Sequence, residues 1–187
     1  MVAPALGAPR RIGRALAALS AVGVLVAMVA SGHLRESKQF VPFVPAGVMP
    51  DAPGEIDRVE MRAGQDRIDL VRAPDGWRTG PDRRAVPASL AAHLDDSIKF
   101  MHVSAPIRVM ERAEWAPVGL GEFGLDPPSY TAILYRGGRP VLGAQFGAPN
   151  PQQVLQYMKL DGRDQVYLMS RFVGQEWEQA LREATLR

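Results

Sequence analysis

The sequence predicts an α+β protein, with an N-terminal transmembrane helix and one extracytoplasmic domain of two strand-strand-strand-helix repeats with antiparallel sheets. Three observations lead to this fold class. An uncharged apolar stretch follows a cluster of arginines near the N-terminus. Short segments of alternating apolar and polar residues, separated by Gly-containing turns, then occur in two sets. Each set ends in a segment whose apolar residues recur at helical spacing.

The first element is the predicted transmembrane helix, residues 15–32, which contains no charged residue and follows Arg10, Arg11 and Arg14. A helix of this length spans roughly 27 Å, enough for the hydrocarbon core of a bilayer. Basic residues before an apolar helix hold its start in the cytoplasm. We therefore expect residues 1–14 in the cytoplasm and a single pass through the inner (cytoplasmic) membrane. The remainder of the chain then lies outside the cytoplasm, in the periplasm if the source is a Gram-negative bacterium.

Two features of this stretch leave alternatives open. Val29-Ala30-Ser31 has the small residues of a signal-peptidase site, so the stretch is either a signal anchor, which its length favours, or a cleaved signal peptide. Small residues also recur at every fourth position, which lets a second helix pack closely in lipid, although an alanine-rich helix carries them everywhere. The pattern favours a partner helix within a membrane complex. The residues in question are Gly13, Ala17 and Ala21 in one row, and Gly23, Ala27 and Ser31 in the other.

Residues 33–54 form a predicted Pro-rich linker. Its four prolines from residue 42 to residue 53 prevent a regular helix or a central strand, so we expect extended chain. A passive spacer would be polar, whereas this segment is rich in apolar side chains. These side chains are expected to contact the protein's own domain, the bilayer surface or a partner subunit. The residues singled out for such contacts are Phe40, Val41, Phe43 and Val44.

Residues 55–187 make up the predicted extracytoplasmic domain. In its first half, about 55–102, two alternating segments within residues 55–72 predict a hairpin, and Trp77, after a Pro-Asp-Gly turn, predicts a short third strand. Apolar residues at i, i+4, i+8 and i+11 then predict a helix over residues 86–102. The first half is thus three strands followed by one helix.

The second half, about 125–182, again places antiparallel strands before a helix. Before it, residues 106–117 are expected to be irregular, with one helical turn around residues 111–115. Its last segment predicts a helix over residues 170–181, and a helix laid on an antiparallel sheet in each half indicates a duplicated unit. The strands predicted in this half cover residues 130–135, 141–146, 154–160 and 165–169.

Between the halves lies the motif Gly124-Leu125-Asp126-Pro127-Pro128. Shorter motifs elsewhere in the domain are Asp75-Gly76-Trp77, Phe146-Gly147, Tyr157 and Val166-Tyr167. On these residues the domain resembles an uncharacterised extracytoplasmic domain-of-unknown-function family that includes auxiliary proteins of gliding-motility-type ABC transporters. The resemblance spans roughly residues 55–182, in a single copy. It implies a membrane-tethered accessory domain and, as an alternative, a periplasmic auxiliary component of an ABC-type export system. It implies no catalytic residue.

The same motif has a physical interpretation of its own. Pro127 excludes helical geometry at Asp126, and Pro128 fixes a further φ near −65°. Gly124 can adopt a positive φ, which other residues rarely do. The segment is therefore a rigid corner that aims the following strand at Tyr130. Such a corner suits a fold landmark, the favoured interpretation, or a recognition surface.

Composition excludes several classes of function. The chain has no cysteine, which removes disulfides, thiolate nucleophiles and Cys-ligated metals. Three of its 22 basic residues and none of its 20 acidic residues precede residue 33, so the body of the protein is almost neutral and nucleic acid is not an expected partner. Residues 119–124 match G-x-G-x-x-G, but the prolines around them prevent the helix that a nucleotide site needs. No nucleotide is expected either.

Candidate catalytic residues are few. His93 and His102 lie on opposite sides of the predicted helix and cannot share a metal ion, while His93 with Asp96 forms either a solvated pair, which we favour, or half of an acid/base couple. We therefore expect no enzyme, cofactor or metal, but an accessory subunit or assembly factor of an integral membrane protein complex. Its helix, linker and domain would contact that complex and the lipid bilayer. The alternatives are a periplasmic enzyme and a ligand-binding module with its ligand between the repeats.

Overall fold

The computed structural model describes residues 19–29 and 44–185 of the chain. The chain divides into a unit that ends at Phe43 and a second unit that begins at Val44. In the first unit residues 19–29 are helical, and the rest of the predicted transmembrane segment lies outside the described residues. Within the residues that are described, no helix is both long and apolar enough to cross a membrane.

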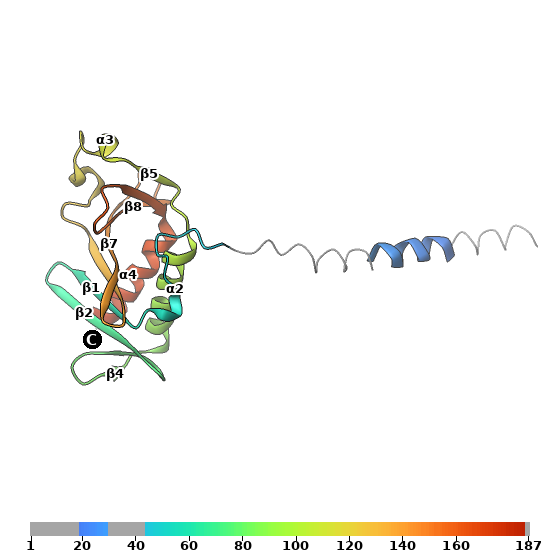
Figure 1. The fold of residues 1–187 in the computed structure, drawn as a ribbon, viewed down its shortest axis with the longest axis horizontal. Helices are drawn as coiled ribbons and strands as arrows, with labels where there is room; N and C mark the ends of the chain where they lie inside the picture. The colour runs from blue at the N-terminus through green and yellow to red at the C-terminus, as the bar shows by residue number, and fades with distance from the viewer. Residues whose placement is uncertain (1–18, 30–43, 186–187) are drawn as a thin grey trace, which may run out of the picture. The chain divides into compact units, whose positions relative to one another are not determined.

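The second unit is an α+β domain, as predicted, built on one antiparallel sheet of nine strands (Figure 1). The strand order is β4-β3-β2-β1-β6-β7-β8-β9-β5. Because β1 pairs with β6, the two predicted sets of strands form a single sheet rather than one sheet each. The strands are β1 Arg58–Ala63, β2 Asp66–Ala73, β3 Gly76–Thr79, β4 Arg84–Ala85, β5 Arg108–Met110, β6 Tyr130–Arg136, β7 Arg139–Pro149, β8 Leu155–Leu160 and β9 Val166–Ser170.

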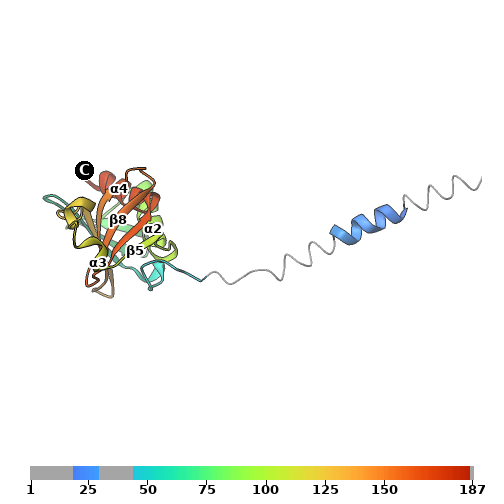
Figure 2. The same ribbon diagram turned by 90° about the horizontal axis from the view of Figure 1, so that it is seen from above.

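Two long helices, α2 (Ala88–Val103) and α4 (Arg171–Thr185), pack against each other and against one face of this sheet (Figures 1 and 2). The short helix α3 (Arg112–Trp115) and the 3₁₀ turns η1 (Pro53–Glu55) and η2 (Leu120–Phe123) lie in the connections. The predicted strands and both long helices are confirmed to within a few residues. Strands β4 and β5 were not predicted, because two or three residues are too few to show alternation.

The main core lies between the sheet and the two long helices. Side chains alternate along a strand, so Val59 and Met61 of β1 enter this core while Glu60 lies on the opposite face. Trp177 of α4 is the largest fully buried side chain, and its ring lies 6.4 Å from that of Phe146 on β7. Burial of such aromatics supplies much of the stabilisation in a domain of this size.

A second, smaller core lies on the opposite face of the sheet. Its buried members are Trp115, Phe123, Leu125 and Val166, and the chain that leads from β5 to β6 supplies all of them except the last. Trp115 also donates a hydrogen bond from Nε1 to the main-chain oxygen of Asp164, at 2.8 Å. The connection between the halves is therefore a packed layer, and α3 within it lies at the end of the domain away from β4 (Figure 1).

The predicted corner at residues 124–128 belongs to this second core. Gly124 has φ +62°, and a Cβ there would lie 2.7 Å from the main-chain nitrogen of Ala148, so glycine is required both by the backbone and by space. Leu125 is buried and forms an isolated bridge with Pro128. The corner thus holds the connection against β7 and delivers the chain to the start of β6.

Candidate binding site

The candidate site begins with residues 45–50, called the strap here, which lie across the C-terminal end of α2. The last carbonyl groups of a helix have no partner within it. The main-chain nitrogens of Gly47 and Met49 donate to two of them, on His102 and Met101, each at 2.9 Å. A Cβ at Gly47 would collide with these same oxygens, so only glycine allows the approach. The Met49 side chain is fully buried in the main core and fixes the strap in place.

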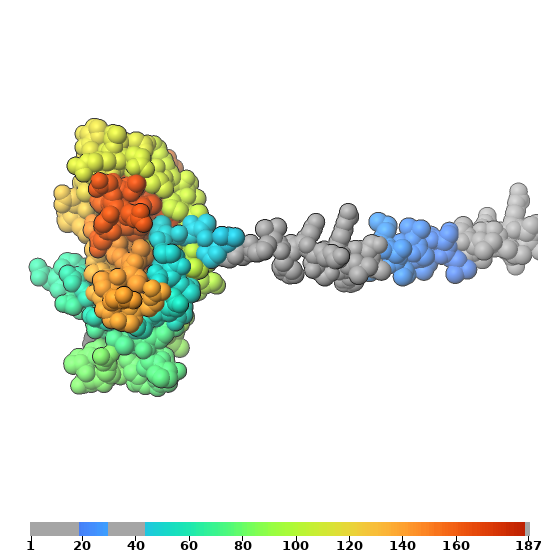
Figure 3. Space-filling model, viewed as in Figure 1, coloured from blue at the N-terminus to red at the C-terminus, as the bar shows by residue number. Residues whose placement is uncertain are grey.

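A cavity of about 760 Å³ opens beside the strap. Strap residues form one wall, the end of β6 and the start of β7 form the second, and the turn from β8 to β9 forms the third. In Figure 3 the strap (cyan), the β6–β7 turn (orange) and the β8–β9 turn (red-orange) surround this region. An adjoining cavity of about 490 Å³ shares Gly47, Val48, Pro50 and Arg163 with it. Both volumes are within the range of small-molecule and peptide sites.

The third wall depends on a close contact between β7 and the β8–β9 turn. The main-chain nitrogen of Asp161 donates to the oxygen of Gly143 at 2.9 Å, and Nε2 of Gln145 donates to Oδ1 of Asp161 at 2.8 Å. A Cβ on Gly143 would collide with the Asp161 carboxylate, so the glycine lets this carboxylate lie over β7. The second oxygen of Asp161 consequently lies at the strand edge that faces the cavity.

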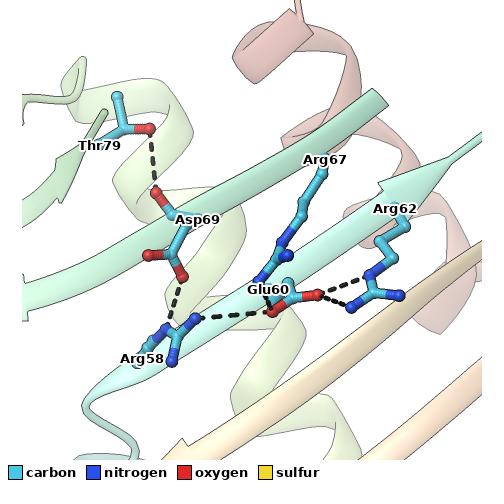
Figure 4. Close-up of polar contacts among 6 residues, drawn as sticks. All are labelled: Arg58, Glu60, Arg62, Arg67, Asp69 and Thr79. Carbon is cyan, nitrogen blue, oxygen red and sulfur yellow. Dashed lines mark hydrogen bonds and ion pairs between the residues drawn. The ribbon is translucent and has the colours of Figure 1, made fainter. Parts of the chain in front are cut away.

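The second wall includes Tyr135, which is supported from behind by a charge cluster around the buried Glu60. The guanidinium of Arg58 lies 4.5 Å from the centre of the Tyr135 ring, a cation–π contact, and its Nε donates to Asp69 at 2.6 Å. Arg58 also pairs with Glu60, a carboxylate only 1% exposed that Arg62 and Arg67 cover from the other side (Figure 4). The hydrogen bond to Asp69 raises the pKa of Arg58 above its ordinary value.

The cavity holds polar groups that have no partner among the described residues. Among residues 19–29 and 44–185, the guanidinium of Arg163 makes no hydrogen bond or ion pair, and the hydroxyls of Tyr135 and Tyr167 make no hydrogen bond. Asp161 retains the oxygen that Gln145 does not bind. Apolar side chains such as Ile133 and Leu142 line the space between these groups. Such a surface can bind a ligand that is partly apolar and carries a carboxylate.

The predicted acid/base candidate lies elsewhere, between the two long helices. Nδ1 of His93 lies 2.7 Å from Glu176 and Nε2 lies 3.6 Å from Glu183, both on α4, so His93 joins the helices rather than pairing with Asp96 on its own helix. Glu183 also accepts a hydrogen bond from Ser89 at 2.7 Å. His102 contacts the main-chain oxygen of Met49 at 3.0 Å and so takes part in holding the strap.

The other predicted contact residues are only partly described. Ala21, Gly23 and Ala27 lie in the helical residues 19–29, whereas Gly13, Ala17 and Ser31 lie outside the described residues. Of the linker residues, Phe40, Val41 and Phe43 also lie outside them, and Val44 is exposed. Farther along the linker the apolar side chain of Met49 packs on the domain itself, one of the three partners that the sequence left open.

Sequence reasoning did not single out Glu60, Tyr135, Gly143 or Arg163. Tyr135 and Glu60 sit in alternating strands and look like ordinary surface residues. Arg163 lies in the predicted turn at residues 161–164, whose residues were interpreted only as turn formers. The signal that could have pointed to the strap is Gly47 between Pro45 and Pro50, which the sequence analysis did not use.

In the part of the chain that the structure describes, no group of three or more His, Asp or Glu side chains is arranged to hold a metal ion. Residues 120–123 of the G-x-G-x-x-G match form the 3₁₀ turn η2, which ends in the left-handed Gly124. Compared with known proteins, the chain matches no family model, no curated protein and no solved structure.

Proposed function

We propose that the chain is a non-enzymatic, single-pass membrane protein of the inner membrane whose periplasmic domain binds another subunit of a larger membrane complex. In this role it serves as an accessory subunit or assembly factor. The surface that binds the partner is the cavity of about 760 Å³ beside the strap, called the strap cavity below.

One observation carries this proposal: the strap, which forms a wall of the cavity, continues toward the N-terminus into the linker and the apolar stretch at residues 15–32. The chain from residue 33 to residue 46 spans at most about 50 Å when fully extended. A ligand bound beside the strap is therefore held within that distance of a bilayer that contains residues 15–32. This arrangement favours a partner that is itself a membrane protein.

The topology also supports an origin of the domain by duplication. Strands β1 to β4 followed by α2 correspond to strands β6 to β9 followed by α4. The two sets meet where β1 pairs with β6, and the two helices pack together on one face. In this proposal the strap and β5 are additions to the two repeated units, and the cavity is a consequence of the strap.

Membrane topology can be tested directly because the chain has no cysteine. We expect a single cysteine placed at the exposed Glu122 (Glu122→Cys) to react in intact cells with a maleimide that crosses the outer membrane but not the inner membrane. Labelling only after lysis would contradict a periplasmic domain. The intact mass of the purified membrane form then distinguishes an anchor, which retains residues 1–31, from a cleaved signal peptide.

Partner binding is tested by purification of the tagged full chain from native membranes in mild detergent. Pro140 is exposed and lines the strap cavity, so Pro140→Trp adds bulk there without disturbing a core. Pro81→Trp is the matched control, since Pro81 is exposed and lines a different cavity between β2 and β4. We expect a partner to co-purify with wild type and Pro81→Trp and to be lost with Pro140→Trp. A lone monomer in several detergents, or an undiminished yield of the partner with Pro140→Trp, would contradict the proposal.

A further inference from the structure

We infer that the partner presents to the strap cavity an extended peptide segment, which adds as a strand to the free edge of β7 and places a carboxylate against Arg163. The inference rests on the proposed function and names the chemistry of the ligand. Three independent features support it: the pairing of β7, the lining of the cavity, and the position of unpaired charge.

Strand β7 has one neighbour along part of its length. It pairs with β6 from Arg139 to Phe146, but its pairing with β8 begins only at Ala144, opposite Leu160. Residues 139–142 therefore have no strand partner on the β8 side among the described residues, while the oxygen of Gly143 already accepts a hydrogen bond from the main-chain nitrogen of Asp161. An open edge of this kind is the surface to which extended peptides add as an extra strand.

The cavity lies along this edge. Pro140, Val141, Leu142 and Gly143 all line it, and the strap bounds its far side. At about 3.3 Å per residue, the four residues from 139 to 142 extend for about 13 Å, which suits a segment of a few residues. Side chains of an added strand alternate, so half of them would meet the apolar lining and half would face away.

Charge defines one end of the segment. Arg163 is exposed and makes no ion pair within the described residues, while it lines both adjoining cavities. A guanidinium binds a carboxylate through paired, charge-assisted hydrogen bonds. The Asp161 carboxylate lies beside the edge over Gly143, where it can accept a main-chain N–H of the added strand. A carboxylate, from a side chain or a chain terminus, is therefore the group expected next to Arg163.

The test uses the full chain in detergent and a displayed library of random octapeptides with free C-termini. Peptides that bind the wild type more than the Pro140→Trp variant are synthesised and titrated. Two arginine variants are compared: Arg163→Ala in the cavity, and Arg84→Ala as matched control. Arg84 is also exposed, lacks an ion pair within the described residues, and lines the cavity between β2 and β4.

We expect the enriched peptides to lose affinity when their side-chain or C-terminal carboxylates are replaced by amides, and to bind Arg163→Ala at least tenfold more weakly, with Arg84→Ala unchanged. Since both arginines are exposed, thermal unfolding followed by circular dichroism should be the same for all three proteins. The failure of any peptide to be enriched, or equal binding to Arg163→Ala and wild type, would overturn the inference.

Strand addition is tested on the peptide rather than on the protein. In an added strand, alternate residues turn their N–H groups toward β7, so N-methylation of that alternate set blocks hydrogen bonding. We expect one set of N-methylated peptides to lose at least tenfold in affinity and the other set to keep it. Equal tolerance of both sets would exclude a strand and overturn the inference.

The two proposals fail separately. If a partner co-purifies with wild type but not with Pro140→Trp, and peptides bind Arg163→Ala as well as wild type, the proposed function is supported and a carboxylate-bearing strand is rejected. If peptide binding requires Arg163 but only a lone monomer is recovered from native membranes, the peptide site is supported and the role as accessory subunit is rejected.

Discussion

The face of the sheet opposite α2 and α4 is covered in two different ways. Over β1 and β2 the cover is charged: Glu60 is enclosed by Arg58, Arg62 and Arg67. Over β8 and β9 the cover is apolar, because the connection from β5 to β6 lays a second core on the strands. One sheet thus shows both means of burying its second face.

The two covers are expected to contribute unequally to the free energy of unfolding. Apolar burial contributes in proportion to area and does not depend on salt, whereas ion pairs with exposed partners contribute little and are screened. The side chains of Arg62 and Arg67 are 53% and 59% exposed. We therefore expect the apolar cover to stabilise the fold and the charged cover mainly to position Arg58 against Tyr135. Predictions at Trp115, Glu60 and Arg67 test this contrast, and Tyr130 adds a polar group inside the main core for comparison; they are given from the largest effect to the smallest.

The largest effect is expected at Trp115. Trp115→Ala removes the central side chain of the second core together with its hydrogen bond to Asp164, and we expect a loss of about 3–4 kcal/mol in the free energy of unfolding. Urea unfolding of the domain measures it, with the exposed Val118→Ala as control, for which less than about 0.5 kcal/mol is expected. A loss at Trp115 below about 1 kcal/mol would show that the apolar cover is dispensable.

Removal of the buried carboxylate comes next. Glu60→Ala leaves three guanidiniums without their shared partner, but because two of them are largely in water we expect only about 2 kcal/mol. The loss should shrink as salt rises, unlike that of Trp115→Ala. Unfolding in 0.05 M and 0.5 M NaCl measures both. If Glu60→Ala lost as much stability as Trp115→Ala, and the loss did not depend on salt, the two covers would stabilise the fold to the same extent.

Tyr130 offers a third case, a polar group inside the main core. Its hydroxyl donates to the main-chain oxygen of Gly174 at 2.9 Å, and burial raises its pKa well above the ordinary value. We expect Tyr130→Phe to lose about 1 kcal/mol at neutral pH.

The raised pKa of Tyr130 also sets a direction with pH. The Tyr130 phenol loses its proton more readily in the unfolded chain than in the folded one. The stability that the protonated phenol contributes is therefore fully present below about pH 10 and is lost as the pH rises above that value. Tyr130→Phe should therefore lose less stability than wild type between pH 9 and pH 11 in thermal unfolding. Equal losses in the two proteins would contradict the assignment.

The smallest effect is expected at Arg67. Its guanidinium contacts Glu60 at 2.8 Å, but more than half of its side chain is exposed. Arg67→Ala should change the free energy of unfolding by about 0.5 kcal/mol or less at physiological salt. A cost above about 1.5 kcal/mol would mean that the charged cover acts as a cooperative network.

The sequence was sufficient to predict the order of elements, because strands such as Tyr130–Arg136 and helices such as Ala88–Val103 carry their periodicity in consecutive residues. The candidate site carries no such pattern. Burial of Glu60 depends on the register that places Arg67 beside it on the next strand. One wall of the cavity depends on the contact of Asp161, in the β8–β9 turn, with Gly143 on β7. Such contacts arise only from tertiary packing.

The hydrogen bonds of Gly47 and Met49 to the end of α2 also have a mechanical meaning. Tension applied to the domain from its N-terminal side reaches these two residues before it reaches any strand of the sheet. A pull strong enough to peel them away would open a wall of the cavity while the nine strands stayed intact. Occupancy of the proposed site would then respond to load.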